Sequence, residues 1–147
     1  MVIPLDKTLT TRSIKMTELE IWTTFWIGVA GNGIYFVGLA FLTWVGLRVG
    51  NNIRNSEDSN MVIKIAGSAF CLTIAFFMLM NGAWMEWHAN GVAGALSSLA
   101  AVGEGSQEFI ANADPGAKFD LMPELPQAIF LLSVLTLQLG LIWSPKD

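Results

Sequence analysis

The sequence predicts an all-α integral membrane protein with three transmembrane helices and a further interfacial helix in the long loop between the second and third. Three observations predict this fold. Only 14% of the 147 residues are charged and 53% are hydrophobic, whereas soluble domains carry about a quarter charged residues. Three uncharged stretches are long enough to cross a bilayer. Most of the tryptophans lie near the ends of these stretches.

The first span is expected over residues 21–47. No charged residue lies between Glu20 and Arg48. A helix rises about 1.5 Å per residue, so about 20 residues cross a hydrocarbon core of about 30 Å. Thr17 and Glu20 form a capping-box pattern just ahead of the run. The helix should therefore begin close to Thr17.

The second and third spans are expected over residues 65–87 and 126–143. Prolines near the start of the third, where a missing N–H costs little, fit its N-terminus. The flanking charged residues are Lys64 and Glu86 around the second run, and Glu124 and Lys146 around the third. The whole chain, residues 1–147, is thus expected to be a single membrane domain.

Tryptophans provide independent support for these boundaries. An amphipathic indole favours the level of the lipid headgroups. Five of the six tryptophans fall within about a turn of a predicted span end, and Trp26 lies one turn deeper. The predicted interfacial anchors are Trp22, Trp26, Trp44, Trp84, Trp87 and Trp143.

The polar and acidic loop over residues 88–124 is expected to contain a helix over about 91–112, lying on the membrane surface or against a partner. Its first part is uncharged but rich in Ala, Gly and Ser. A re-entrant segment or a fourth span is therefore the alternative. Asp114-Pro115-Gly116 should then form a turn.

Basic residues are evenly divided between the two sides of the membrane in a three-span topology. Those beside the short loop between the first two spans lie closer to helix ends, where positive charge matters more. This favours an outward-facing N-terminus and acidic loop. A bacterial inner membrane, or an organellar inner membrane, is the expected setting.

Small and polar residues at depth predict helix faces that meet protein, because glycine lets backbones approach and a buried amide needs a hydrogen-bond partner. In the first span, Gly28 to Gly33 could instead form a broken helix lining a substrate or ion path. A close helix crossing is the simpler interpretation. The candidates are Gly28, Gly31, Asn32, Gly33, Gly67, Cys71 and Gln138.

Glu86 and the only histidine, His88, form a candidate polar or metal site. Residues two apart on a helix point about 200° away from each other, and a metal needs more ligands. A helix end with tryptophan anchors is the simpler interpretation. The alternative is a site that another subunit completes. Because this chain alone offers too few ligands, no metal is assigned to it.

No catalytic motif occurs, so neither catalytic residues nor cofactors are predicted from this chain alone. The net charge of −4 and the lack of a basic cluster argue against nucleic acid. We expect an accessory or structural subunit of a larger membrane complex, in contact with lipid and with other integral membrane subunits. The alternatives are a homo-oligomeric channel or transporter, and a cofactor-adjacent subunit of a membrane enzyme.

Overall fold

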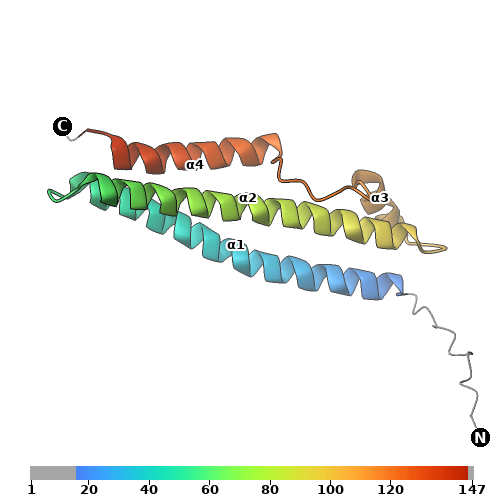
Figure 1. The fold of residues 1–147 in the computed structure, drawn as a ribbon. Coiled ribbons are helices and arrows are strands. Elements are labelled where there is room, and N and C mark those ends of the chain that lie inside the picture. Colours follow the sequence, from blue (N-terminus) through green and yellow to red (C-terminus); the bar gives the residue numbers. More distant parts are fainter. Residues whose placement is uncertain (1–15, 146–147) are drawn as a thin grey trace, which may run out of the picture.

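The computed structural model describes residues 16–145. They form helices α1 (Glu18–Asn55), α2 (Met61–Ser97), α3 (Glu104–Asn112) and α4 (Leu125–Trp143). α1 and α2 run antiparallel along the length of the molecule, α4 covers the half near their connection, and α3 lies at the opposite end (Figure 1). α1, α2 and α4 are long and apolar enough to cross a membrane. The predicted all-α membrane fold with three candidate spans is confirmed.

α1 begins where the capping-box pattern predicts. The Thr17 side chain accepts a hydrogen bond from the Glu20 backbone N–H, and the Glu20 carboxylate accepts one from the Thr17 N–H at 2.7 Å. The helix continues past the predicted 21–47 to Asn55, because the polar residues after Leu47 can extend a helix beyond an apolar run. Its 38 residues correspond to a length of about 57 Å.

The expected bounds of the helix at 91–112 are wrong. α2 continues to Ser97, and α3 begins only at Glu104. Ser97 and Ser98 end α2, since their hydroxyls donate back to the carbonyls of Gly94 and Ala95 at 2.8 and 2.7 Å. Such bonds compete with helical backbone bonding. The first part of the expected loop therefore belongs to α2.

α4 packs against both α1 and α2 in one half of the molecule. We call this half the three-helix layer. At its centre lies Gln138, of which only 1% is exposed. Its side-chain amide donates to the Thr43 carbonyl of α1 at 3.0 Å. A Cβ on Gly46 would overlap that amide nitrogen. The chain thus supplies the hydrogen-bond partner that Gln138 needs at this depth.

Two further glycines let the helices of the three-helix layer approach. A Cβ on Gly67 would lie 2.5 Å from Cδ1 of Ile53, and one on Gly50 would lie 3.1 Å from the Gln138 carbonyl oxygen. Beside them, Ile53, Cys71 and Ile142 form a buried cluster. Close packing of this kind is the main attraction between helices in lipid.

Residues 18–32 of α1, residues 85–97 of α2, and α3 together form what we call the arm. Its core contains Ile21 and Phe25 from α1 and Leu96 from α2. Phe109 of α3 packs on this core. The rings of Trp22 and Phe109 meet edge to face, with centroids 5.1 Å apart.

α3 is held to the start of α1 by Glu18. The Glu18 carboxylate accepts a hydrogen bond from the Gly103 N–H at 3.2 Å and another from the Ser106 hydroxyl. The Trp22 indole N–H donates to the same hydroxyl at 2.8 Å. Gly103 has no side chain to cap α3. A remote carboxylate therefore supplies the negative charge that a helix N-terminus favours.

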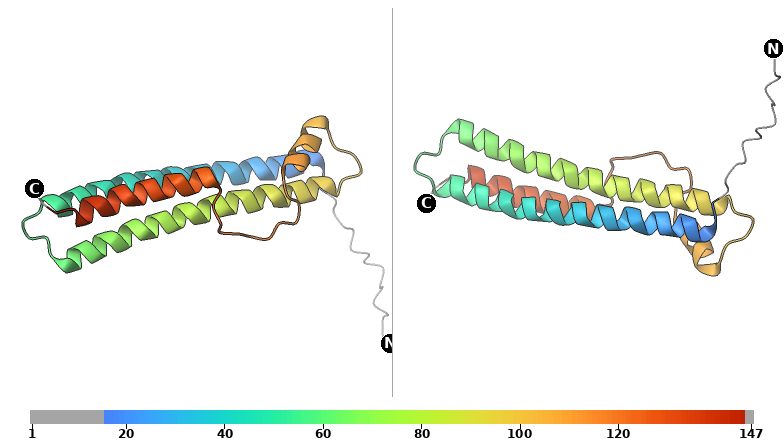
Figure 2. Two further views of the ribbon diagram at one scale, coloured as in Figure 1. Left: turned by 90° about the horizontal axis from the view of Figure 1, so that it is seen from above. Right: turned by 90° about the horizontal axis from the view of Figure 1, so that it is seen from below.

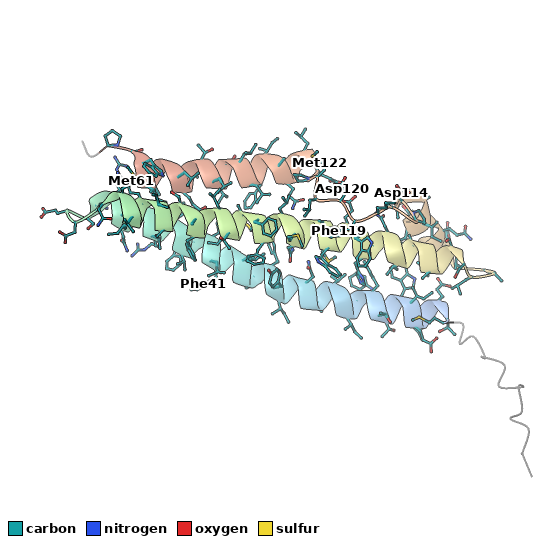
Figure 3. All side chains as sticks on the ribbon, in the orientation of Figure 1. Phe41, Met61, Asp114, Phe119, Asp120 and Met122 are labelled. Atoms are coloured by element: carbon teal, nitrogen blue, oxygen red, sulfur yellow. The ribbon has the colours of Figure 1, made fainter. Side chains whose placement is uncertain are left out.

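Residues 113–124, the return segment, lead from α3 back to α4 and pass beside α2 (Figure 2). The Asp114 N–H donates to Oδ1 of buried Asn90 at 3.0 Å. The predicted turn is confirmed, since the Ala117 N–H bonds the Asp114 carbonyl and Gly116 has φ of 102°. Phe119 packs on Trp84, with ring centroids 6.2 Å apart. Figure 3 shows Asp114 and Phe119 on the return segment.

Gly46→Ala should destabilise the three-helix layer. The added methyl group displaces the Gln138 amide from the Thr43 carbonyl, and an unsatisfied buried amide costs about 1–3 kcal/mol. Unfolding in mixed detergent micelles, followed by circular dichroism, measures this loss. Gly140→Ala on α4 is the matched control, because its methyl group meets nothing within 4 Å. Equal stability of the two variants would contradict the packing described here.

Glu18→Ala should loosen α3 while leaving α1 and α2 helical. The variant removes the acceptor shared by Gly103 and Ser106. Amide hydrogen exchange over residues 104–112 should become several-fold faster. Glu108→Ala is the control, because Glu108 is an exposed carboxylate on α3 itself. Unchanged exchange in the Glu18 variant would show that apolar contacts alone hold α3.

Candidate functional site

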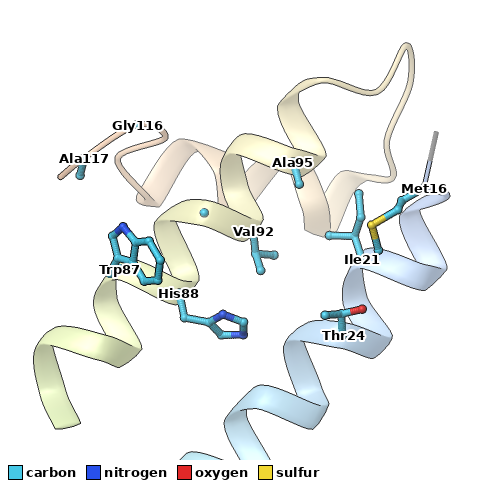
Figure 4. A pocket seen from close by; sticks show the side chains of 10 residues that line it. Met16, Ile21, Thr24, Trp87, His88, Val92, Ala95, Gly116 and Ala117 are labelled. Carbon is cyan, nitrogen blue, oxygen red and sulfur yellow. The ribbon is translucent and has the colours of Figure 1, made fainter. Parts of the chain in front are cut away.

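Three adjoining cavities lie between α1 and α2. The arm cavity, of about 360 Å³, is lined by Ile21, Thr24 and Val92 among others and contains the His88 side chain at one end. Figure 4 shows the His88 ring extending from α2 towards α1. The middle cavity, of about 320 Å³, shares His88 and continues past Gly28. The three cavities follow the α1–α2 crossing from the arm towards the three-helix layer.

The third cavity, which we call the Asn81 cavity, measures about 290 Å³. It shares Asn32 and Trp84 with the middle cavity. Apolar and aromatic side chains form most of its wall, and three polar side chains face it. Its full lining is Asn32, Tyr35, Phe77, Met80, Asn81 and Trp84.

Asn81 is the most enclosed of these polar residues. It is 8% exposed, and its Oδ1 is buried without a hydrogen-bond partner. Among the described residues, neither Asn32 nor Tyr35 has a side-chain hydrogen-bond partner either. In an apolar setting each unsatisfied group costs free energy. Several polar side chains without hydrogen-bond partners therefore face the Asn81 cavity.

His88 occupies a niche made by α1. Its ring stacks on Phe25, with centroids 5.6 Å apart and planes 16° from parallel. A Cβ on Gly28 would lie 2.5 Å from His88 Nε2, so only glycine leaves room for the ring. That nitrogen is buried and has no hydrogen-bond partner. The niche positions a single imidazole among apolar neighbours.

The candidate pair of Glu86 and His88 is not joined by a hydrogen bond or an ion pair. Glu86 is exposed, whereas His88 turns towards α1. Within residues 16–145, no three His, Cys, Asp or Glu side chains gather where they could hold a metal ion. Both residues lie inside α2 rather than at its end. The described part of this chain thus offers an isolated imidazole here.

Four of the predicted helix-interface residues lie at contacts between helices, and the other three do not. Gly28 lies at the α1–α2 crossing, and Gly67, Cys71 and Gln138 lie in the three-helix layer. A Cβ on Gly31 or Gly33 would meet nothing within 4 Å. Asn32 lines two cavities instead of bonding a neighbouring helix.

The predicted tryptophan anchors also differ in environment. Trp22 is half-buried in the arm core and hydrogen-bonded to Ser106. The other five keep large exposed surfaces. These exposed indoles are Trp26, Trp44, Trp84, Trp87 and Trp143.

Sequence reasoning did not single out Tyr35 or Asn81 as site residues, nor Gly46 and Gly50 as packing residues. The two glycines stand four apart in α1, which is helical spacing for one face, but Gly50 lies beyond the expected span of 21–47. Asn81 precedes His88 by seven residues, which also places both on one face of α2. Nothing in the sequence pairs Tyr35 with Asn81, because their proximity arises from the helix crossing.

Comparison with known proteins finds no protein-family model, no curated protein and no solved structure that matches this chain.

Gly28→Ala should expel the His88 ring from its niche. The chain has one histidine, so selective ¹⁵N labelling of histidine gives a spectrum of His88 alone. We expect a clear shift and broadening of the ring signals, because the methyl group would overlap Nε2. Gly31→Ala is the control, since its methyl group meets open space. Identical spectra for both variants would refute this placement of His88.

Proposed function

We propose that this protein is an accessory structural subunit of a larger membrane complex, and that the arm is its docking element. The observation that carries the proposal is the difference in length between the helices. α4 has 19 residues and rises about 28 Å, close to the hydrocarbon thickness of about 30 Å. α1 is twice as long. If the three-helix layer fills the bilayer, the arm extends beyond it.

The surface of the arm supports a protein partner. Leu19, Trp26 and Ile27 are 76, 61 and 69% exposed. Large apolar side chains gathered outside the hydrocarbon core favour contact with another protein. Strong tilting of α1 could instead bury them in lipid, but mismatch and tilt carry a cost for every ångström. A partner subunit on the arm removes that cost.

The charges suggest which side the arm occupies. Arg54 lies in the last turn of α1 and Lys64 in the first turn of α2, whereas the arm and the return segment carry mainly carboxylates. By the rule that positive charge stays inside, the arm faces outward. We propose a bacterial or organellar inner membrane, and a partner with a basic surface beside the arm. The acidic residues of the arm and the return segment are Glu18, Glu20, Glu86, Glu104, Glu108, Asp114, Asp120 and Glu124.

The test is a gentle pull-down of the tagged protein from its native membranes, with mass spectrometry of the co-purified chains. Larger membrane subunits should be recovered in stoichiometric amounts. Alanine at Leu19, Trp26 and Ile27 together should lower that recovery at least tenfold, because apolar anchors contribute about 1–2 kcal/mol or more each.

Alanine at Leu132 and Leu137 is the matched control, because both leucines are equally exposed but lie on α4. That variant should retain its partners. Recovery of the chain alone as a monodisperse species would overturn the accessory role. Recovery as a defined homo-oligomer would favour a channel, to be measured as ion flux into liposomes.

A further inference from the structure

The Asn81 cavity combines polar groups that lack partners with a wall that is otherwise apolar. Asn81 and Asn32 come from different helices and face the same space. A side-chain amide without partners is costly in hydrocarbon, so such groups in a membrane protein mark functional surfaces. An occupant that brings hydrogen-bonding atoms to this cavity would stabilise both amides.

The depth of the cavity indicates an amphiphile. Gln127, in the first turn of α4, packs directly against Gly82, the neighbour of Asn81. The cavity therefore lies at the edge of the three-helix layer. Trp84, half exposed in its wall, belongs to the residue type that favours the headgroup level. A lipid-soluble molecule with one polar end would place that end at this depth.

The lining also restricts the charge of the occupant. Among residues 16–145, no Lys, Arg, Asp or Glu side chain lines the Asn81 cavity or the middle cavity. An anionic headgroup in the Asn81 cavity would find no basic partner, because His88 lines only the middle cavity and the arm cavity. The aromatic faces of Phe77 and Trp84 instead suit a flat ring. Pockets that bind small ligands share this pattern of an apolar wall with a few placed polar groups.

We propose that the Asn81 cavity binds the ring of an uncharged membrane lipid whose ring carries carbonyl or hydroxyl oxygens, as in a prenylated quinone. Asn81 and Asn32 hydrogen-bond the ring oxygens, and Trp84 packs on its face. The apolar tail leaves the Asn81 cavity on the side of Phe77 and extends into the hydrocarbon beside the three-helix layer. This binding site is independent of what docks on the arm.

Tryptophan quenching by decylubiquinone, with the full chain in lipid nanodiscs, tests the proposal. The titration should saturate, and Trp84→Phe should lower the amplitude of the quenching, which Trp87 then carries because its ring centroid lies 5.1 Å from that of Trp84. Alanine at Asn32 and Asn81 together should raise the dissociation constant about tenfold, because two hydrogen bonds of about 0.5–1.5 kcal/mol each are lost. Asn32→Ala alone, which leaves buried Asn81 in place, should show a smaller rise.

The control variant carries alanine at Ser133 and Thr136, whose hydroxyls bond only to carbonyls of their own helix. It should bind as the unmodified protein does. A parallel titration with a fluorescent sterol tests whether a lipid with a ring hydroxyl, in place of a quinone, binds in the cavity. Saturable energy transfer from Trp84 to the sterol, lost in the Asn variants, would support the proposal for that lipid class.

Quenching that never saturates with either lipid, or that is equal in all variants, would overturn the proposal. A photoreactive amino acid at Tyr35 gives a second test in native membranes. Cross-links to lipid support the proposal. Cross-links to a polypeptide would instead assign the cavity to a partner helix.

Discussion

The length of α4 is the physical constraint on which the rest of the structure depends. α4 has just enough residues to cross hydrocarbon, and it packs on helices that continue well past it. Where α4 is present, each helix has two neighbours, and glycines with Gln138 fill the centre. Where α4 is absent, α1 and α2 have only each other, so their crossing leaves cavities. α3 compensates at the far end by covering the apolar faces of Phe25 and Leu96.

Polar side chains differ in hydrogen bonding along the length of the molecule. In the three-helix layer, Gln138 bonds a carbonyl of α1. In the arm, Glu18 and Ser106 bond each other across a separation of 88 residues. Between these two places, Asn32 and Asn81 have no such partners. The contrast locates the candidate site, because Gln138 on one side of it and Glu18 with Ser106 on the other are hydrogen-bonded.

Much of the fold follows from the sequence, because uncharged runs of sufficient length leave few alternatives in lipid. The start of α1 at the Thr17 capping box and the turn at Asp114 were also predictable from local chemistry. The break after Ser97 was not, since Ala, Gly and Ser between 91 and 103 fit either a helix or a loop. The candidate site was predictable only in part. Asn32 and His88 stood out as polar residues in apolar runs, but a crossing angle brings Asn32, Tyr35 and Asn81 together.

The return segment sets how far α4 can move. Twelve residues reach at most about 40 Å when fully extended, and Phe119 and Asp114 fasten this stretch along α2. An α4 that separates from its neighbours thus stays within a short reach of them. Tethers of this kind hold a binding element at an effective concentration of about millimolar. The connection between α3 and α4 therefore restricts α4 to the neighbourhood of the face on which it packs.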